Sequence, residues 1–183
     1  LMAGCGNARF SAAMYDSGIV TDIHNVDLSS VVIEQMRTEN VERTDMKYYV
    51  QNVRALDFAD ETFDCTVDKS TMDCLYCCDD SREACRDMVR ECYRVLKPGG
   101  VHISLSLHAP EKGLGYLAPR GSLKWEVNHF LVPNPRYDGP DSGRSEHHTV
   151  FVCRKPLNAD PRGGSGGGHS VASAGSGSGV GPS

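Results

Sequence analysis

A glycine turn near the start of the chain is the first feature with chemical meaning. Gly4 and Gly6 follow the apolar residues 1–3 and precede a segment whose apolar residues have helical spacing. Glycines between a strand and a helix let the backbone approach a ligand where a side chain would collide. The dinucleotide fingerprint needs a third glycine at position 9, where this chain has Arg9. The turn therefore favours a ligand without a pyrophosphate, although a plain strand-to-helix turn has the same pattern.

Asp27 ends the second apolar strand segment, a little over twenty residues after the glycine turn. A carboxylate in this position can accept hydrogen bonds from both ribose hydroxyls of an adenosine ligand, each contributing roughly 1.5–3 kcal/mol. The same residue could instead cap the helix that begins near Ser29. Its spacing from Gly4 and Gly6 favours the ribose assignment.

Asn52 follows the third strand segment, between Gln51 and Val53. An amide here can accept from an adenine amino group while a backbone N–H reaches a ring nitrogen. The alternative is an ordinary polar residue at the start of a loop.

Asp68, Lys69 and Asp73 follow the fourth strand segment. In an open α/β sheet the binding crevice lies outside the carboxyl ends of the strands, so these residues are expected to face it. Asp68 could accept from an ammonium group of the ligand. Alternatively, Lys69 is a solvated surface charge, and Thr71 or Asp73 caps the next helix.

The cysteines and histidines give little support for a metal site, and no metal is expected. Only Cys74 and Cys77 have ligand-like spacing, and no second pair or histidine follows nearby. Cys85 and Cys92 fall on the apolar face of a helix, where cysteine behaves as a small hydrophobe. His108 is the histidine placed nearest the expected crevice, and a solvated loop histidine is its alternative interpretation.

The elements that must position these residues alternate between strands and helices. Short connections between them are typical of a mostly parallel, doubly wound α/β sheet. A Pro/Gly/Asp-rich loop joins the last two strand-like segments, which predicts an antiparallel hairpin at the sheet edge. The pattern predicts strands at 1–3, 19–26, 46–50, 63–67, 101–107, 123–132 and 147–154, and helices at 8–17, from 31 onward and at 81–96.

Composition limits the possible partners and location. The net charge of −5 is spread along the 183 residues, which argues against a duplex nucleic-acid partner. No apolar run approaches the roughly 20 residues of a membrane span. The eight cysteines in a chain with regular periodicity favour a reducing compartment, so a cytoplasmic location is expected. We divide the chain into a domain at 1–155 and a Gly/Ser-rich tail at 156–183, which is expected to be disordered.

Four segments together resemble class I S-adenosylmethionine-dependent methyltransferases, which have a Rossmann-like fold. They are Gly4–Asn7, Asn25–Val32, Val67–Asp73 and Arg94–Gly100. The greatest similarity is to the eukaryotic methyltransferase-like family that contains the elongation-factor-1-alpha lysine and N-terminal methyltransferases, and it runs from residue 1 to about residue 155. The resemblance implies S-adenosyl-L-methionine as the methyl donor, with contacts at Gly4, Cys5, Gly6, Asn7, Asp27, Leu28, Asn52, Val53, Asp68 and Lys69.

The chain departs from this family at three places. Members usually have aspartate where Asn52 stands, so weakened donor binding is expected. Members usually have glycine where Ser70 stands, which changes the floor of the crevice. The start of the first strand and the preceding helix are absent, so we expect an N-terminally truncated domain.

The resemblance favours methyl transfer to a protein lysine or terminal amine, with a protein substrate such as a translation factor. Catalysis would consist mainly of alignment, because the sulfonium of the donor is already activated. Asp68, Asp73 and His108 are the candidates to position the acceptor. The first alternative is a degenerate binding module without activity, favoured by Asn52 and Ser70. The second is a nicotinamide-dependent oxidoreductase, which Arg9 disfavours.

Overall fold

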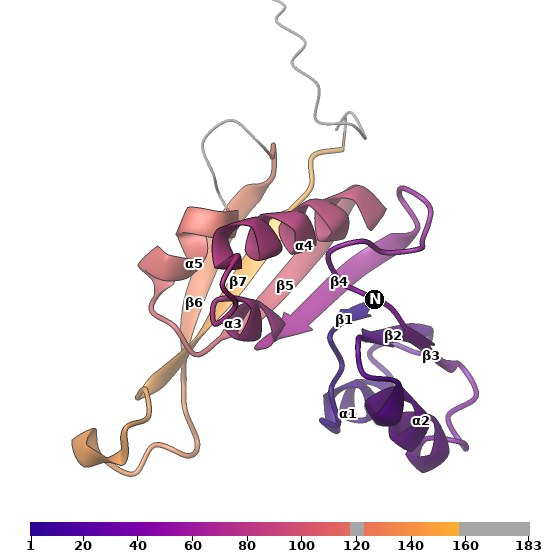
Figure 1. Ribbon diagram of the computed structural model, residues 1–183, viewed down its shortest axis with the longest axis horizontal. Coiled ribbons are helices and arrows are strands. Elements are labelled where there is room, and N and C mark those ends of the chain that lie inside the picture. Colours follow the sequence, from indigo (N-terminus) through magenta and orange to yellow (C-terminus); the bar gives the residue numbers. More distant parts are fainter. Residues whose placement is uncertain (118–122, 158–183) are drawn as a thin grey trace, which may run out of the picture.

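One mixed β-sheet organises the part of the chain that the structure describes, residues 1–117 and 123–157 (Figure 1). In the computed structural model the strand order is β3-β2-β1-β4-β5-β7-β6. The first five strands are parallel, whereas β7 is antiparallel to β5 and β6 is antiparallel to β7. The predicted doubly wound sheet with a C-terminal hairpin is thus confirmed. The strands are β1 Met2–Ala3, β2 Ile23–Asp27, β3 Met46–Val50, β4 Phe63–Lys69, β5 Leu96–Ser106, β6 Glu126–Pro133 and β7 His147–Arg154.

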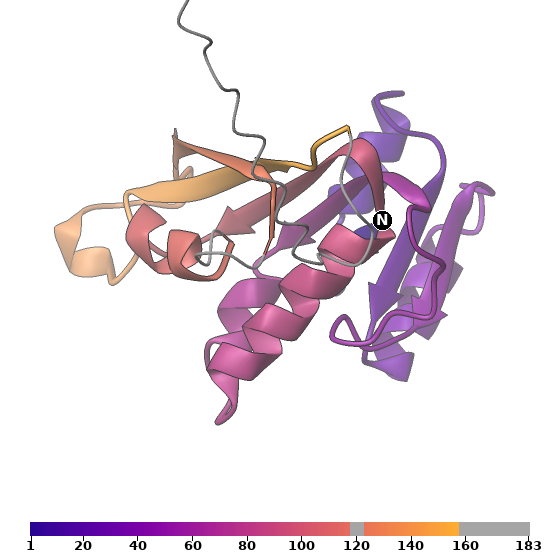
Figure 2. The ribbon, with the colours of Figure 1, turned by 90° about the horizontal axis from the view of Figure 1, so that it is seen from above.

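Helices pack on both faces of this sheet (Figure 2). Because side chains alternate between the faces of a strand, the neighbouring residues Met2 and Ala3 belong to two different hydrophobic cores. One core lies between the sheet and α1 and α2, and the other lies beneath α3, α4 and α5. The helices are α1 Phe10–Asp16, α2 Ser30–Glu39, α3 Thr71–Leu75, α4 Ser81–Val95 and α5 Pro110–Leu117, with a short 3-10 helix at Pro140–Ser142.

The sequence pattern predicts α4 but not α5, because only α4 has a strong apolar periodicity. The prediction for α4 is correct to within one residue, because its apolar residues form one buried face that includes Cys85 and Cys92. The sequence did not predict α5, which contains two glycines that weaken helix propensity. Tertiary packing explains one of them. A Cβ atom on Gly113 would overlap the ring of Phe151 on β7, so only glycine allows α5 to approach the sheet this closely.

The largest differences between predicted and observed strand boundaries are at the starts of β2 and β5. β2 begins at Ile23 and not at Ile19, which is 78% exposed and lies in the preceding loop. β5 begins at Leu96, five residues before the predicted Val101, because Leu96 already pairs with Phe63. A register shift between Phe63 and Cys65 accommodates the extra residues of β5, including Gly99 and Gly100, that precede Val101.

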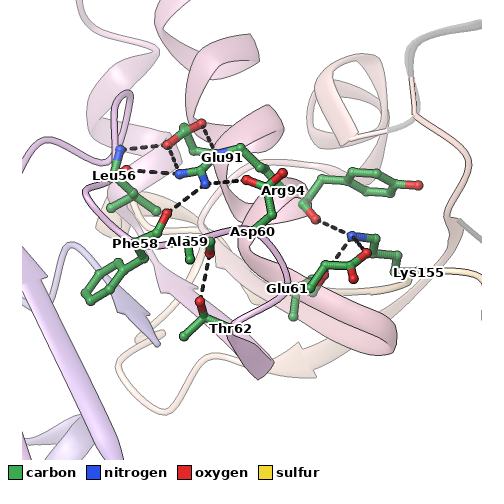
Figure 3. Close-up of polar contacts among 11 residues, drawn as sticks. Leu56, Phe58, Ala59, Asp60, Glu61, Thr62, Glu91, Arg94 and Lys155 are labelled. Atoms are coloured by element: carbon green, nitrogen blue, oxygen red, sulfur yellow. Dashed lines mark hydrogen bonds and ion pairs between the residues drawn. The ribbon is translucent and has the colours of Figure 1, made fainter. Parts of the chain in front are cut away.

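A fully buried lysine joins the end of α4 to the end of β7 (Figure 3). Lys155 Nζ donates to the carbonyl oxygens of Tyr93 and Leu96 at 3.1 and 2.7 Å, and it lies 3.6 Å from Glu61 Oε1. Burial lowers the pKa of Lys155, and the charge of Glu61 opposes this effect. The ammonium therefore satisfies the carbonyl groups that the last turn of α4 would otherwise leave unpaired.

All eight cysteines lie in the described ranges, and each is a free thiol. No helix in those ranges has both the length and the apolar character needed to cross a bilayer. Residues 158–183, which include most of the predicted tail, lie outside the described part of the chain.

Candidate functional site

A cavity of about 380 Å³ opens where β1, β2, β3 and β4 end. In the sheet, β2 and β3 lie on one side of β1, and β4 lies on the other side. The cavity therefore lies where the strand order reverses, which is the usual ligand position in open α/β sheets. Nine of the ten predicted donor contacts line it, and Asp68 does not. The lining residues are Gly4, Cys5, Gly6, Asn7, Ala8, Asp27, Leu28, Gln51, Asn52, Val53, Lys69, Ser70, Thr71, Cys74 and Leu75.

The glycine turn after β1 has a backbone conformation that favours glycine. Gly4 and Gly6 have φ values of +76° and +53°, in the left-handed region that other L-residues rarely adopt. Thr71 Oγ1 donates to the Ala3 carbonyl at 2.8 Å, and a Cβ atom on Gly4 would collide with the Thr71 side chain. A Cβ atom on Gly6 would meet no protein atom within 4 Å. Gly4 therefore serves close packing against α3, whereas Gly6 presents bare backbone to open space.

The Asp27 carboxylate is fixed by two backbone N–H groups. Oδ2 accepts from Gly6 N at 2.9 Å, and Oδ1 accepts from Ser29 N at 3.0 Å. Ser29 itself caps α2, because its hydroxyl accepts from Val32 N at 3.3 Å. The alternative interpretation of Asp27 as the helix cap is therefore wrong. Each carboxylate oxygen accepts one of these bonds and keeps capacity for a second.

The loop after β3 carries the amide groups at the far side of the cavity. Asn52 Oδ1 accepts from Arg54 N at 3.0 Å, which forms a local turn. Gln51 Oε1 accepts from Asp57 N at 3.1 Å. Both side-chain oxygens thus hold the backbone of their own loop. An aspartate at position 52 would accept the same bond with a full charge, so asparagine preserves the turn.

Arg94 of α4 fixes the rest of that loop (Figure 3). Its guanidinium donates to the carbonyl oxygens of Leu56 and Phe58 at 2.9 and 2.7 Å and to Asp60 Oδ1 at 2.8 Å. Glu91 holds the guanidinium through both carboxylate oxygens, at 2.8 Å each. The segment between Asn52 and β4 is therefore tied to the rigid helix α4, which keeps the wall of the cavity in place.

Comparison with known proteins shows the family to which the chain belongs. A family profile described as "Methyltransferase domain" matches residues 1–104, more than half of the chain and every residue that lines the cavity. The chain belongs to this methyltransferase family. Two solved structures share the fold of this methyltransferase domain. An S-adenosylmethionine-dependent methyltransferase from Methanosarcina mazei has a TM-score of 0.66 at 16% identity, over 85% of this chain and 91% of that one. An N-methyltransferase from Bradyrhizobium japonicum, in complex with S-adenosyl-L-homocysteine, has a TM-score of 0.65 at 16% identity, over 85% and 76%.

Curated relatives are more similar in sequence. The mouse "eEF1A lysine and N-terminal methyltransferase" is 36% identical over 139 residues, which are 72% of this chain and 19% of the relative. The bovine "EEF1A lysine methyltransferase 4" is 31% identical over 142 residues, 73% of this chain and 55% of the relative. This methyltransferase domain therefore spans about a fifth of the length of the first relative and just over half of the second.

Asp68 of this methyltransferase domain lies behind the cavity wall. It is fully buried, and Oδ1 accepts from Thr71 N at 2.7 Å and from Met72 N at 3.3 Å. Oδ2 accepts from Ser104 Oγ at 2.8 Å. The interpretation of Asp68 as a direct ligand contact or acceptor-positioning group does not fit this placement, because α3 and β5 surround the carboxylate. It instead holds the first turn of α3, whose residues line the cavity.

Asp68 belongs to a set of buried polar groups between β4 and β5 that also includes His102. Burial raises the pKa of Asp68 to about 6, and hydrogen bonds from Ser104 and the α3 backbone oppose this effect. Burial lowers the pKa of His102 to about 4. The folded state keeps the Asp68 proton longer than the unfolded state, so this residue lowers stability as the pH rises from about 4 to about 6. His102 has the opposite effect, because the unfolded state binds its proton first as the pH falls from about 6.5 to about 4.

Replacing either residue by asparagine is expected to reveal that residue's own contribution to the pH dependence of stability. The free energy of unfolding of His102→Asn, relative to wild type, should rise by up to about 3 kcal/mol as the pH falls from about 6.5 to about 4. That of Asp68→Asn, relative to wild type, should rise by a similar amount as the pH increases from about 4 to about 6. Urea unfolding at both ends of each range measures these differences. Variants whose stability runs parallel to wild type at all pH values would contradict the assignment.

Ser70 stands where family members usually have glycine, and its backbone explains why. Its φ is +63°, and the chain is pinned on both sides: Ser70 N donates to the Leu105 carbonyl at 2.9 Å, and its own carbonyl accepts from Cys74 N at 3.1 Å. The hydroxyl makes no capping bond to α3. The left-handed conformation therefore costs the serine energy that glycine would not lose.

Ser70→Gly is expected to raise the free energy of unfolding by about 0.5–1 kcal/mol, because relief of backbone strain exceeds the added entropy of the unfolded chain. Ser70→Ala is the matched control, since alanine also loses the hydroxyl but keeps the strain. Urea unfolding of wild type, Ser70→Gly and Ser70→Ala measures the three free energies of unfolding. Equal effects of glycine and alanine would show that the hydroxyl, and not the backbone, determines stability here.

Asp73 and His108 also lie outside the cavity lining. Asp73 accepts from Ser106 Oγ at 2.6 Å and from Leu107 N at 2.9 Å, so it fixes the end of β5. His108 N donates to Ser106 Oγ at 3.0 Å, and its side chain is 34% exposed. Asp73 is thus a structural residue behind the site, and its predicted role in direct acceptor positioning does not fit its burial. His108 follows β5, the neighbour of β4 in the sheet, and its role in acceptor positioning stays a prediction.

Sequence reasoning missed two residues that α3 supplies to the cavity wall, Cys74 and Leu75. Thr71, Cys74 and Leu75 line the cavity because they fall on one face of this short helix. The spacing of these three residues was the available signal. Within the described ranges, no group of three or more His, Cys, Asp or Glu residues could hold a metal ion, so Cys74 lines the cavity without metal-ligand partners.

Proposed function

We propose that this methyltransferase domain binds S-adenosylmethionine in the cavity and transfers its methyl group to a lysine or terminal amine of a protein. The observation that carries the proposal is the Asp27 carboxylate, held by Gly6 N and Ser29 N beside a bare glycine turn. The cavity of about 380 Å³ falls within the range of small-molecule sites, about 300–1,000 Å³. The residues that line the cavity suit the methionyl part of the donor at one end and its adenosine part at the other.

The chain's own residues would bind and orient the donor. Backbone groups of the turn at Gly4–Asn7, which lines the cavity, would hold the methionyl part, where side chains would exclude it. Asp27 would accept hydrogen bonds from the ribose hydroxyls, and Asn52 with the backbone of Val53 would hold the adenine. Leu28, which is 71% exposed, gains a partner when an apolar ring covers it. When bound, the donor supplies an activated methyl group, so the protein's task is alignment of the acceptor.

A protein amine as acceptor is supported by the curated relatives, whose names specify eEF1A lysine and N-terminal methylation. A lysine must lose its proton before transfer, and desolvation at the cavity mouth would lower its pKa. We infer that a translation factor such as eEF1A is a substrate. The eight free thiols fit a reducing compartment such as the cytoplasm.

Calorimetric titration followed by a transfer assay tests this proposal. S-adenosylmethionine and S-adenosylhomocysteine should bind with one site per chain, and NAD should not bind. Incubation with labelled donor and purified eEF1A should then label a lysine or the N-terminus of eEF1A. Absence of donor binding would overturn the proposal.

A binding module without activity is the second candidate, favoured by the strained Ser70 and by Asn52 in place of aspartate. Donor binding with no transfer to eEF1A or to lysine peptides would select it. Restoration of transfer by Ser70→Gly and Asn52→Asp together would show that these two departures alone removed the activity.

A further inference from the structure

An aromatic cluster lies between α3 and α5, outside the residues that line the cavity. Tyr76 directly follows α3, His108 precedes α5, and Tyr116 lies on α5. The Tyr76 ring centre is 5.1 Å from that of His108 and 4.9 Å from that of Tyr116. We call these three residues the aromatic recess. His108 lies two residues before α5 begins and Tyr116 lies near the end of this helix, and both rings contact Tyr76.

A lysine ammonium already occupies the aromatic recess. Lys112 Nζ lies 4.5 Å from the centre of the Tyr76 ring and 3.2 Å from His108 Nε2. An ammonium has donors only, so His108 Nε2 must accept this hydrogen bond and present its lone pair. The contact shows that the recess accommodates the end of a lysine side chain.

The chemistry of the recess selects a positive charge. The face of an aromatic ring attracts cations through its quadrupole. The buried carboxylate of Asp73 adds negative charge, since its Oδ1 lies 4.0 Å from His108 Nε2. Ring face, imidazole lone pair and carboxylate therefore favour the same kind of ligand. A neutral side chain of equal length would gain none of these interactions.

The recess and the cavity are connected through α3. Cys74 and Leu75 line the cavity, and Tyr76 is the next residue along the chain. Asp73 ties the same helix to the end of β5 through Leu107 N. His108 and Tyr116 lie beyond residue 104, where the match to the family profile ends. The recess thus joins a residue inside the profile match, Tyr76, with two residues beyond it.

Lys112 can be displaced from the recess because it is an exposed residue of α5. Exposed ammonium groups remain strongly hydrated and gain little net free energy from a single contact. A second ammonium, delivered by a bound polypeptide, can therefore replace it.

We propose that the aromatic recess binds a protonated basic side chain of the acceptor polypeptide, and that Lys112 occupies this position until the acceptor displaces it. The inference rests on the proposed function, because it places the acceptor polypeptide beside the donor cavity. The amine that receives the methyl group must be neutral at the moment of transfer. The recess, which selects a positive charge, therefore recognises a neighbouring basic residue of the acceptor and not the reacting amine.

The first test uses N-acetyl-lysine amide as the probe and N-acetyl-norleucine amide as its neutral counterpart. Lys112→Met should empty the recess, and Lys124→Met is the matched control, because Lys124 is a lysine elsewhere on the chain, outside the recess. Binding is followed through the side-chain NMR signals of His108. The lysine probe should bind Lys112→Met about ten-fold more tightly than wild type, as expected if Lys112 fills the recess about nine-tenths of the time. Lys124→Met should match wild type, and the norleucine probe should not bind.

Variants of Tyr76 test the ring itself in the Lys112→Met background. Tyr76→Leu should abolish the gain in probe affinity, whereas Tyr76→Phe should keep it, because the ring face and not the hydroxyl attracts the cation. Melting temperatures identify any Tyr76 variant that fails to fold. In that case the lysine-probe affinities of Lys112→Met and Lys124→Met still test the proposal. Equal binding of the lysine and norleucine probes to Lys112→Met would overturn the proposal.

Donor titration of the same variants separates this inference from the proposed function. Tyr76 and Lys112 do not line the cavity, so S-adenosylmethionine affinity should be unchanged in each variant. A wild-type chain that does not bind the donor would overturn the proposed function. The probe experiment needs no donor, so it would still report on the recess.

Discussion

Asp27→Ala is expected to weaken S-adenosylmethionine binding at least ten-fold. The substitution removes the acceptor of two ribose hydroxyl bonds, each worth roughly 1.5–3 kcal/mol. It also frees Gly6 N and Ser29 N, which the carboxylate holds at 2.9 and 3.0 Å, so the glycine turn loses its anchor. Calorimetric titration of wild type and variant measures the change in affinity.

The loss of donor affinity must be separated from a general loss of stability, and Ser29→Ala provides that control. Ser29 caps α2 but does not line the cavity, so its replacement should cost about 1 kcal/mol of stability and leave donor affinity unchanged. Asp27→Asn should bind with intermediate affinity, because one oxygen remains as an acceptor while the amide nitrogen cannot accept. Wild-type affinity in Asp27→Ala would exclude the ribose assignment.

The cavity could be predicted from the sequence to the extent that its residues follow strands. Gly4, Asp27 and Asn52 each stand at or just after the end of an apolar strand segment, and the carboxyl ends of parallel strands meet at one edge of the sheet. The same rule fails for Asp68, which still belongs to β4. There, the alternation of side chains between the two faces points the carboxylate beneath α3, away from the ligand.

The aromatic recess could not be predicted in this way. Tyr76 and His108 are separated by more than thirty residues, and their contact depends on where α5 packs. That helix has two glycines in its short sequence, so its local pattern does not indicate a helix. Its position is fixed by the fit of Gly113 against Phe151, a contact between segments far apart in the sequence. Long-range packing of this kind leaves no local trace in the sequence.

At Ser70, in contrast, the sequence pattern does indicate a local feature of the structure. Glycine, the family's usual residue at this position, is typical of a left-handed backbone, and Ser70 has a φ of +63°. A departure from a family pattern is thus informative when the pattern has a conformational cause. The departure at Asn52 has a milder consequence, because asparagine makes the same local turn.

Gly4→Ala is expected to cost about 3 kcal/mol of stability and to abolish measurable donor binding. The left-handed φ of +76° is strained for alanine by roughly 1–2 kcal/mol, and overlap of the new methyl group with Thr71 adds about 1–3 kcal/mol. Either the turn or α3 must move to relieve the overlap, and both line the cavity. Urea unfolding and donor titration measure the two effects.

A double-mutant cycle with Thr71→Ala isolates the steric part. Thr71→Ala removes the two atoms nearest the new methyl group, Oγ1 and Cγ2, and leaves only the Cβ at 2.9 Å. Gly4→Ala should therefore cost less in that background, approaching the backbone strain of about 1–2 kcal/mol. Gly6→Ala is the matched control, because its φ is also left-handed while its Cβ would meet no protein atom within 4 Å. It should lose donor affinity with a smaller loss of stability, and it should show no coupling to Thr71. Equal costs of Gly4→Ala in both backgrounds would mean that strain alone, and not the close approach of α3 to the turn, requires glycine at position 4.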